Sequence, residues 1–218
     1  MKKLFFALLF VSLSICAGAQ DKHAHGSLKD LNVDFMMRGY FCAGSKIEDK
    51  QALGGFGPSE NFPKPIDPKM SVSRDEISLI AMPDEAAAFA GKYKGMKVVL
   101  VNATNGTVGF PASDSRLSIV QEALDQRGEW KPIEYLPSSW CGNSYHTVFL
   151  GPNEFWEFAA ARYTGKFKTR LRFRLDGQKS GTGNVTIYSN EFEGSVNARQ
   201  FTIQQGHTPT SIMDPYNN

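Results

Sequence analysis

The chain has 218 residues, of which 24 are Lys or Arg and 22 are Asp or Glu, so its formal net charge is +2. This length suits one large domain or two small ones and is sufficient for a hydrophobic core. A charge so near zero gives no general electrostatic argument for binding nucleic acid or an anionic membrane surface.

The amino terminus has the three parts of a secretory signal peptide, which we assign to residues 1–19. Lys2 and Lys3 carry its positive charge, and Leu4–Ile15 forms its apolar part, which is too short to span a bilayer. The small residues of Ala17–Ala19 predict cleavage after Ala19, which leaves basic and acidic residues equal in number at 22 each. We therefore expect an exported protein that is periplasmic, on the outer-membrane surface or secreted.

Lipid attachment at Cys16 is an alternative that the sequence disfavours. The bulky Ile15 stands where lipoprotein processing requires a small residue. No later stretch holds the roughly 20 apolar residues that a membrane-spanning helix needs, so we expect no transmembrane segment.

Residues 20–69 form a loop-rich extension ahead of the main domain. His23 and His25 could bind a metal weakly, but a frayed terminus is the better interpretation, and we expect no metal and no cofactor. The stretch 52–68 is rich in Gly and Pro and is predicted to be a connector. Cys42 in this extension is predicted to form a disulfide with Cys141, because exported proteins meet an oxidising environment. Two free thiols or an intermolecular bridge are the alternatives.

Strand patterns begin near Met70 and continue to residue 204, and 205–218 is predicted to be a flexible tail. Asp84–Ala90 is a brief helical candidate, because acidic residues occupy its first turn and Gly91 follows it. Asn105-Gly106 predicts a tight hairpin. Short strands are expected at Ile77–Met82, Met96–Val101, Thr107–Phe110, Arg116–Leu124, Glu129–Leu136, Asn184–Tyr188 and Arg199–Ile203. The fold class is therefore all-β, a Greek-key sandwich of about eight or nine strands by the spacing of such signals.

Lys166–Leu175 has the clearest strand pattern, since basic residues alternate with apolar residues and Thr169 along its whole length. Its basic face includes Lys168, Arg170, Arg172 and Arg174, which could bind an anionic polysaccharide or another polyanion. The alternative is a solvated face whose cations pair with acids on neighbouring strands.

The segment 136–158 concentrates aromatic and polar side chains around Cys141. A nucleophilic Cys141 activated by His146 is disfavoured, because a bridged cysteine has no thiol. Trp140, Tyr145, Phe155 and Trp156 could stack on sugars, but packing in the core is the favoured alternative. Asn143 and His146 are further candidates for a binding surface.

Paired carboxylates, as in glycoside hydrolases, are the other route to chemistry. Acids near aromatic residues occur at Glu154, Glu157, Glu191 and Glu193, but nothing in the sequence selects a pair. Motifs for a phosphate loop, an activated serine or a metal site are not found in the sequence.

Four short motifs resemble bacterial immunoglobulin-like sandwich domains of exported Bacteroidota-type proteins. They are Asn102 after an apolar strand, Gly128–Ile133 (GEWKPI), Leu150–Glu154 (LGPNE) and Tyr163–Phe167 (YTGKF). The third motif has Asn153 where the turn glycine is usual in that family. The resemblance implies an immunoglobulin-like sandwich and carries no activity.

These observations predict an exported, non-enzymatic binding protein or envelope-assembly subunit. Its partner would be a protein or a glycan of the cell envelope. A secreted hydrolase acting on polysaccharide is the alternative, and it requires a groove holding two carboxylates.

Overall fold

The computed structural model describes residues 27–137, 141–179 and 183–205 of the chain. The predicted signal peptide, Cys16, Trp140 and the predicted tail lie outside these residues, apart from residue 205. Within them the fold is all-β, as expected: strands are joined by loops and by two short 3-10 helices, η1 (Gly142–Ser144) and η2 (Ala198–Phe201). No helix in these ranges is both long and apolar enough to cross a membrane.

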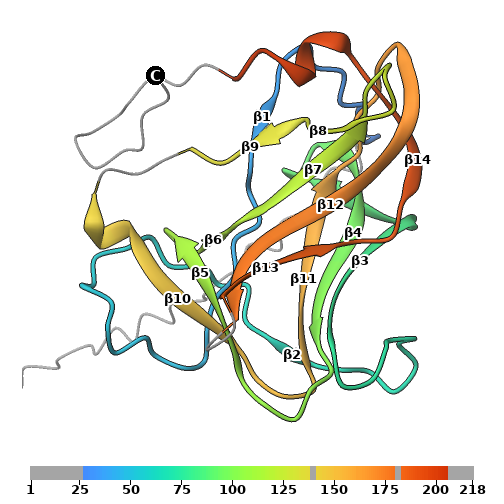
Figure 1. Ribbon diagram of the computed structural model, residues 1–218. Helices are drawn as coiled ribbons and strands as arrows, with labels where there is room; N and C mark the ends of the chain where they lie inside the picture. Colours follow the sequence, from blue (N-terminus) through green and yellow to red (C-terminus); the bar gives the residue numbers. More distant parts are fainter. Residues whose placement is uncertain (1–26, 138–140, 180–182, 206–218) are drawn as a thin grey trace, which may run out of the picture.

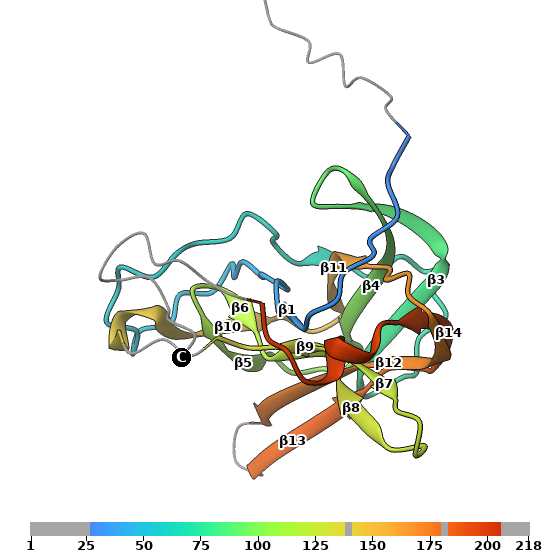
Figure 2. The ribbon, with the colours of Figure 1, turned by 90° about the horizontal axis from the view of Figure 1, so that it is seen from above.

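Two antiparallel sheets form the body of the molecule (Figures 1 and 2). One sheet has the order β2 (Lys64–Pro65), β11 (Glu154–Ala161), β4 (Tyr93–Asn102) and β3 (Ile77–Phe89). The other has the order β13 (Gly183–Tyr188), β12 (Phe167–Lys179), β7 (Ile119–Leu124) and β8 (Trp130–Pro132), and β14 (Phe192–Val196) pairs with the first half of β12.

Two smaller sheets extend this body. β10 (Tyr145–Leu150), β5 (Val108–Ser113) and β6 (Arg116–Leu117) form an antiparallel sheet, and β1 (Met37–Arg38) runs parallel to β9 (Glu134–Tyr135). In Figure 1 the segment after β1, drawn in blue to cyan, passes beside β10 and β5.

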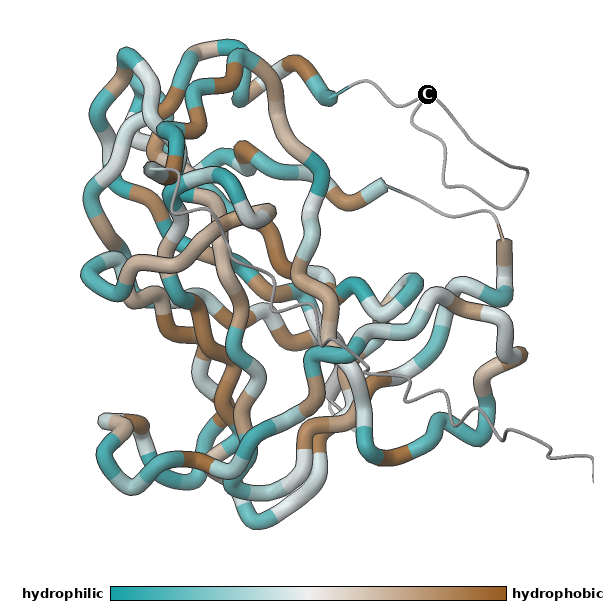
Figure 3. The backbone as a smooth tube through the Cα atoms, turned by 180° about the vertical axis from the view of Figure 1, so that it is seen from behind, coloured by the Kyte–Doolittle hydropathy of each residue, from teal (hydrophilic) through white to brown (hydrophobic). Residues whose placement is uncertain are grey.

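The core lies between the two large sheets, and apolar and polar residues alternate along several strands (Figure 3). On β12, Leu171, Phe173 and Leu175 are almost fully buried, whereas Arg172 and Arg174 between them are not, as the alternation predicts. Trp156 is fully buried between the sheets. Burial of each such side chain contributes about 1.5–3 kcal/mol. The predicted extension also supplies core residues, among them Phe41.

Three local expectations are wrong, each because long-range pairing overrides a local pattern. Asp84–Phe89 is the second half of β3 and not a helix; it pairs with β4 after a bulge that begins at Met82. So short a helix would be marginal alone, and β4 offers an edge to pair with. The strands on either side of Asn105-Gly106 belong to different sheets and form no hairpin. Arg199–Ile203 contains part of η2, and β14 is the last strand described.

The predicted disulfide is also wrong, since Cys42 and Cys141 are not bonded to each other. The backbone of Cys42 pairs with Arg116 on β6, and β5 separates β6 from β10. Cys141 lies four residues before β10. The two cysteines are therefore placed by different strands of this small sheet, Cys42 beside β6 and Cys141 ahead of β10.

The motifs behind the family resemblance have structural roles. Asn102 is fully buried, and its Nδ2 donates to the carbonyl oxygens of Gly106, Leu150 and Gly151 at 2.7–3.0 Å. Asn153 has φ of 54°, the left-handed conformation that Gly or Asn adopts most readily. These residues therefore fix a corner between strands and do not form a site.

Candidate functional site

A long loop, residues 44–61, is closed by a backbone hydrogen bond between its two ends. The Gly44 N–H donates to the Asn61 carbonyl at 2.8 Å, and the buried Trp156 Nε1–H donates to the Gly44 carbonyl at 2.9 Å. A Cβ at Gly44 would lie 2.3 Å from the Ser59 carbonyl oxygen, so only glycine fits there. The loop is therefore anchored to the core through β11.

The same loop covers the outer edge of β10. Asp49 Oδ2 accepts a hydrogen bond from the Thr147 N–H at 2.6 Å, and Ser45 Oγ accepts one from the Phe149 N–H at 3.1 Å. The Gln51 N–H is the main cause that lowers the pKa of the Asp49 carboxyl, followed by the hydrogen bonds from Thr147. The side chains of Asp49 and Ser45 thus accept the hydrogen bonds that a neighbouring strand would accept. Without them, the outer edge of β10 would present unpaired N–H groups.

The tight turn between β5 and β6 is bonded to loop 44–61. Asp114 and Ser115 have φ of 49° and 60°, which is unfavourable for residues other than glycine. Asp114 Oδ1 accepts from the Gly57 N–H, and Ser115 Oγ donates to the Gly57 carbonyl, both at 2.8 Å. These two bonds hold Gly57, and hence the far side of the loop, over the turn.

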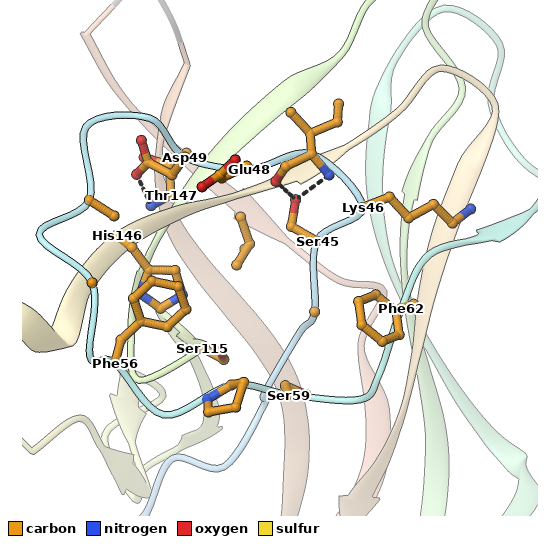
Figure 4. Close-up of a pocket in the computed structure, with 16 residues that line it drawn as sticks. Ser45, Lys46, Glu48, Asp49, Phe56, Ser59, Phe62, Ser115, His146 and Thr147 are labelled. Carbon is orange, nitrogen blue, oxygen red and sulfur yellow. Dashed lines mark hydrogen bonds between the residues drawn. The ribbon is translucent and has the colours of Figure 1, made fainter.

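The loop and β10 enclose a pocket of about 370 Å³, a size typical of ligand sites (Figure 4). His146 lines it, is 8 % exposed and stacks on Phe56 with ring centroids 3.7 Å apart. Its Nδ1 lies 3.1 Å from the Ser144 carbonyl oxygen, which can only accept, so Nδ1 carries the proton. When the ring is neutral, Nε2 is then an acceptor, and this atom is buried without a hydrogen-bond partner.

Exposed apolar side chains surround this pocket. Ile47 and Phe62 line it and are 45 % and 43 % exposed, and Leu53 on the same loop is 75 % exposed. Clustered exposed apolar residues usually mark an interaction surface. The pocket therefore combines apolar walls with one buried acceptor that lacks a donor.

The basic face of β12 is largely neutralised by carboxylates. Arg170 pairs with Glu191 at 2.6 Å, and Arg172 and Arg174 both pair with the buried Glu122 at 2.9 and 2.6 Å. The Arg172 guanidinium also lies 4.2 Å and 3.9 Å from the centroids of the Trp130 and Tyr188 rings.

Lys168 has no acidic partner among the described residues. Ion pairs with nearby carboxylates thus account for the three arginines, and their predicted role in binding a polyanion stays a prediction.

Of the other predicted residues that the structure describes, Asn143 lies near the pocket with His146: its Nδ2 is adjacent to Gly55 of the loop. Tyr145 is half-exposed and lines a different, smaller cavity. The fully buried Trp156 is a core residue, as expected.

The candidate carboxylates are mostly engaged in ion pairs. Glu154 pairs with Lys46, Glu157 with Lys64 and Lys97, and Glu191 with Arg170. The acids that line the pocket are Glu48 and Asp49, and Asp49 is already used to cap β10. No group of three His, Cys, Asp or Glu in the described part of the chain is arranged to hold a metal ion.

The loop residues of the pocket, such as Ser45, Asp49 and Phe56, were not predicted from sequence. One signal could have identified them, because a loop of this length without secondary structure is uncommon and is frequently functional. No protein-family model matches this chain, and no curated protein matches it either.

Proposed function

We propose that the chain is an exported binding protein whose ligand site is the pocket between loop 44–61 and β10. The buried, unpartnered Nε2 of His146 is the observation that carries the proposal. An unpaired buried acceptor is costly, and a ligand donor that reaches it removes that cost. The apolar walls suit a ligand group with an aliphatic or aromatic body and one hydroxyl or N–H donor. The resemblance of residues 102–167 to immunoglobulin-like domains supports an immunoglobulin-like topology for the scaffold.

His146→Phe is the sharpest test, because phenylalanine keeps the stacking on Phe56 and removes the acceptor. Binding would be followed by NMR titration with a panel of methyl glycosides, aliphatic alcohols and aromatic amines. We expect at least one probe to shift signals of the pocket residues, and its affinity to fall at least tenfold in His146→Phe. The stability of the variant should stay within about 1 kcal/mol of the parent chain, because only the bond to Ser144 is lost.

Glu48→Gln is the matched control, because it alters a polar pocket residue and leaves His146 intact. Its affinity for the same probe should change less than threefold. The proposal is wrong if no probe perturbs the pocket, or if His146→Phe binds as tightly as the parent chain.

A further inference from the structure

A second cavity, of about 240 Å³, lies on the other side of the β5–β6 hairpin. Its polar lining includes Ser113 and Arg116, which face each other across the hairpin, and its walls are mainly apolar. The apolar lining residues are Pro111, Ala112, Leu117, Leu136 and Pro137.

Several polar atoms in and next to this cavity lack partners. Arg116 Nη2 and Ser113 Oγ are buried without a hydrogen bond. Nε and Nη2 of Arg38 are buried and unbonded as well; Arg38 does not line the cavity, but it pairs on β1 with Tyr135, the residue before the lining residue Leu136. No carboxylate in the described residues lies within 4.0 Å of either guanidinium. The carboxylate that acts electrostatically on Arg116 is that of Asp114, whose Oδ1 is already bonded to the Gly57 N–H.

The two arginines also repel each other. Burial is the main cause that lowers the pKa of Arg116, and the charge of Arg38 lowers it further, although Cys42 and Asp114 act in the opposite direction. Arginine nevertheless remains protonated in proteins, so two uncompensated positive charges lie close together. Buried charges are normally paired, and a planar guanidinium is best satisfied by an oxyanion.

We propose that Arg38, Arg116 and Ser113 form a binding site for one oxyanion, a carboxylate, sulfate or phosphate group. The fork of Arg116 and the N–H groups of Arg38 donate to the oxyanion, and the Ser113 hydroxyl adds a third donor. The apolar walls accept the carbon atoms next to that group. This site differs from the basic face of β12, where the arginines already have carboxylate partners.

The test reads binding directly from the arginine side chains. The Nε–Hε NMR signals of the ¹⁵N-labelled protein would be followed during titration with sodium sulfate, phosphate and acetate at constant ionic strength. Thermal shifts are less suitable, because sulfate stabilises folded proteins without binding. We expect saturable shifts of the Arg38 and Arg116 signals and none for Arg199, which is exposed and lies near Asp34.

Lysine substitutions test the guanidinium geometry, because lysine keeps the positive charge and lacks the planar N–H donors. Arg38→Lys and Arg116→Lys should each weaken binding at least tenfold, whereas Arg199→Lys should change it less than twofold. Ser113→Ala should weaken binding about threefold, and it serves as the second test if an arginine variant fails to fold. Shifts that do not saturate, or that persist unchanged in Arg116→Lys and Ser113→Ala, would overturn the site.

An oligomer of galacturonic acid distinguishes the source of the oxyanion. Binding at least tenfold tighter than that of acetate indicates an acidic group carried by a polysaccharide, and equal affinity indicates a small free anion. Because this site does not share a lining residue with the pocket of His146, either proposal can fail without the other.

Discussion

Several residues with unfavourable backbone conformations or unpaired buried polar atoms lie in the sheet of β10, β5 and β6. Asp114 and Ser115 adopt left-handed backbone conformations, and His146 Nε2 and Arg116 Nη2 are buried without partners. All four belong to β10, β6 or the β5–β6 turn. Proteins keep such costs where function requires them, so this clustering is an argument for placing both proposed sites here.

Ala90 is a left-handed residue outside that cluster, and it is suited to stabilisation. Its φ is 48°, it is exposed, and Gly91 follows with φ of 69° in the turn between β3 and β4. Ala90→Asn would place the favoured Asn-Gly pair in this turn. We expect thermal unfolding to show a gain of about 1 kcal/mol, or a rise in Tm of about 2–4 °C. The matched Ala88→Asn, on the extended part of β3, should give no gain; equal gains in both would show that backbone strain at Ala90 is not the cause.

Among the elements, loop 44–61 has an unusual role, because its side chains take the place of a strand beside β10. Asp49→Ala removes the acceptor of the Thr147 N–H and should cost about 1 kcal/mol. Hydrogen exchange should then be faster at Thr147, while Val148, whose N–H points towards β5 by strand alternation, should keep its rate. Glu48→Ala is the control and should leave both rates unchanged. Unchanged exchange at Thr147 in Asp49→Ala would mean that the carboxylate does not protect the edge.

Elements differ in how far the sequence predicts them. β12 was predicted with its inner and outer faces, because a period of two over many residues is a local signal. The Asp84–Ala90 segment was not, because pairing with β4 decides its conformation. His146 was a candidate from sequence, but Ser45 and Asp49 were not. Their contacts with Phe149 and Thr147 span 104 and 98 residues, and such contacts leave no periodic pattern.

At the scale of the whole molecule, a buried polar cluster around Glu134 connects several elements that are distant in the sequence. Oε1 of Glu134 accepts from the hydroxyls of Tyr40 and Tyr163 at 2.8 and 2.7 Å, and Oε2 accepts from the Gln121 N–H at 3.0 Å. The Tyr40 hydroxyl in turn accepts from the Ala161 N–H. The cluster therefore connects the segment after β1 to β7, β9 and the end of β11.

This cluster makes the stability of the whole chain depend on pH. Burial raises the pKa of Glu134 from 4.5 to about 7, although hydrogen bonds from Tyr163, Gln121 and Tyr40 oppose the shift. Between these two values the folded state keeps a proton that the unfolded state has released, so stability falls as pH rises. Urea unfolding should therefore give a contribution of about 3 kcal/mol at pH 4 that is lost by about pH 8, at 1.36 kcal/mol for each pKa unit.

Glu134→Gln should remove this contribution while keeping an oxygen that both tyrosines can donate to. The side-chain NH₂ of the new glutamine would face the Gln121 N–H, so we expect the variant to be less stable than the parent chain at pH 5. Its stability should nevertheless change less with pH between pH 5 and 8. Glu154→Gln, which alters a more exposed carboxylate paired with Lys46, should keep the parent slope. Parallel slopes for Glu134→Gln and the parent chain would show that Glu134 is ionised throughout, and that hydrogen bonding and not burial controls its proton.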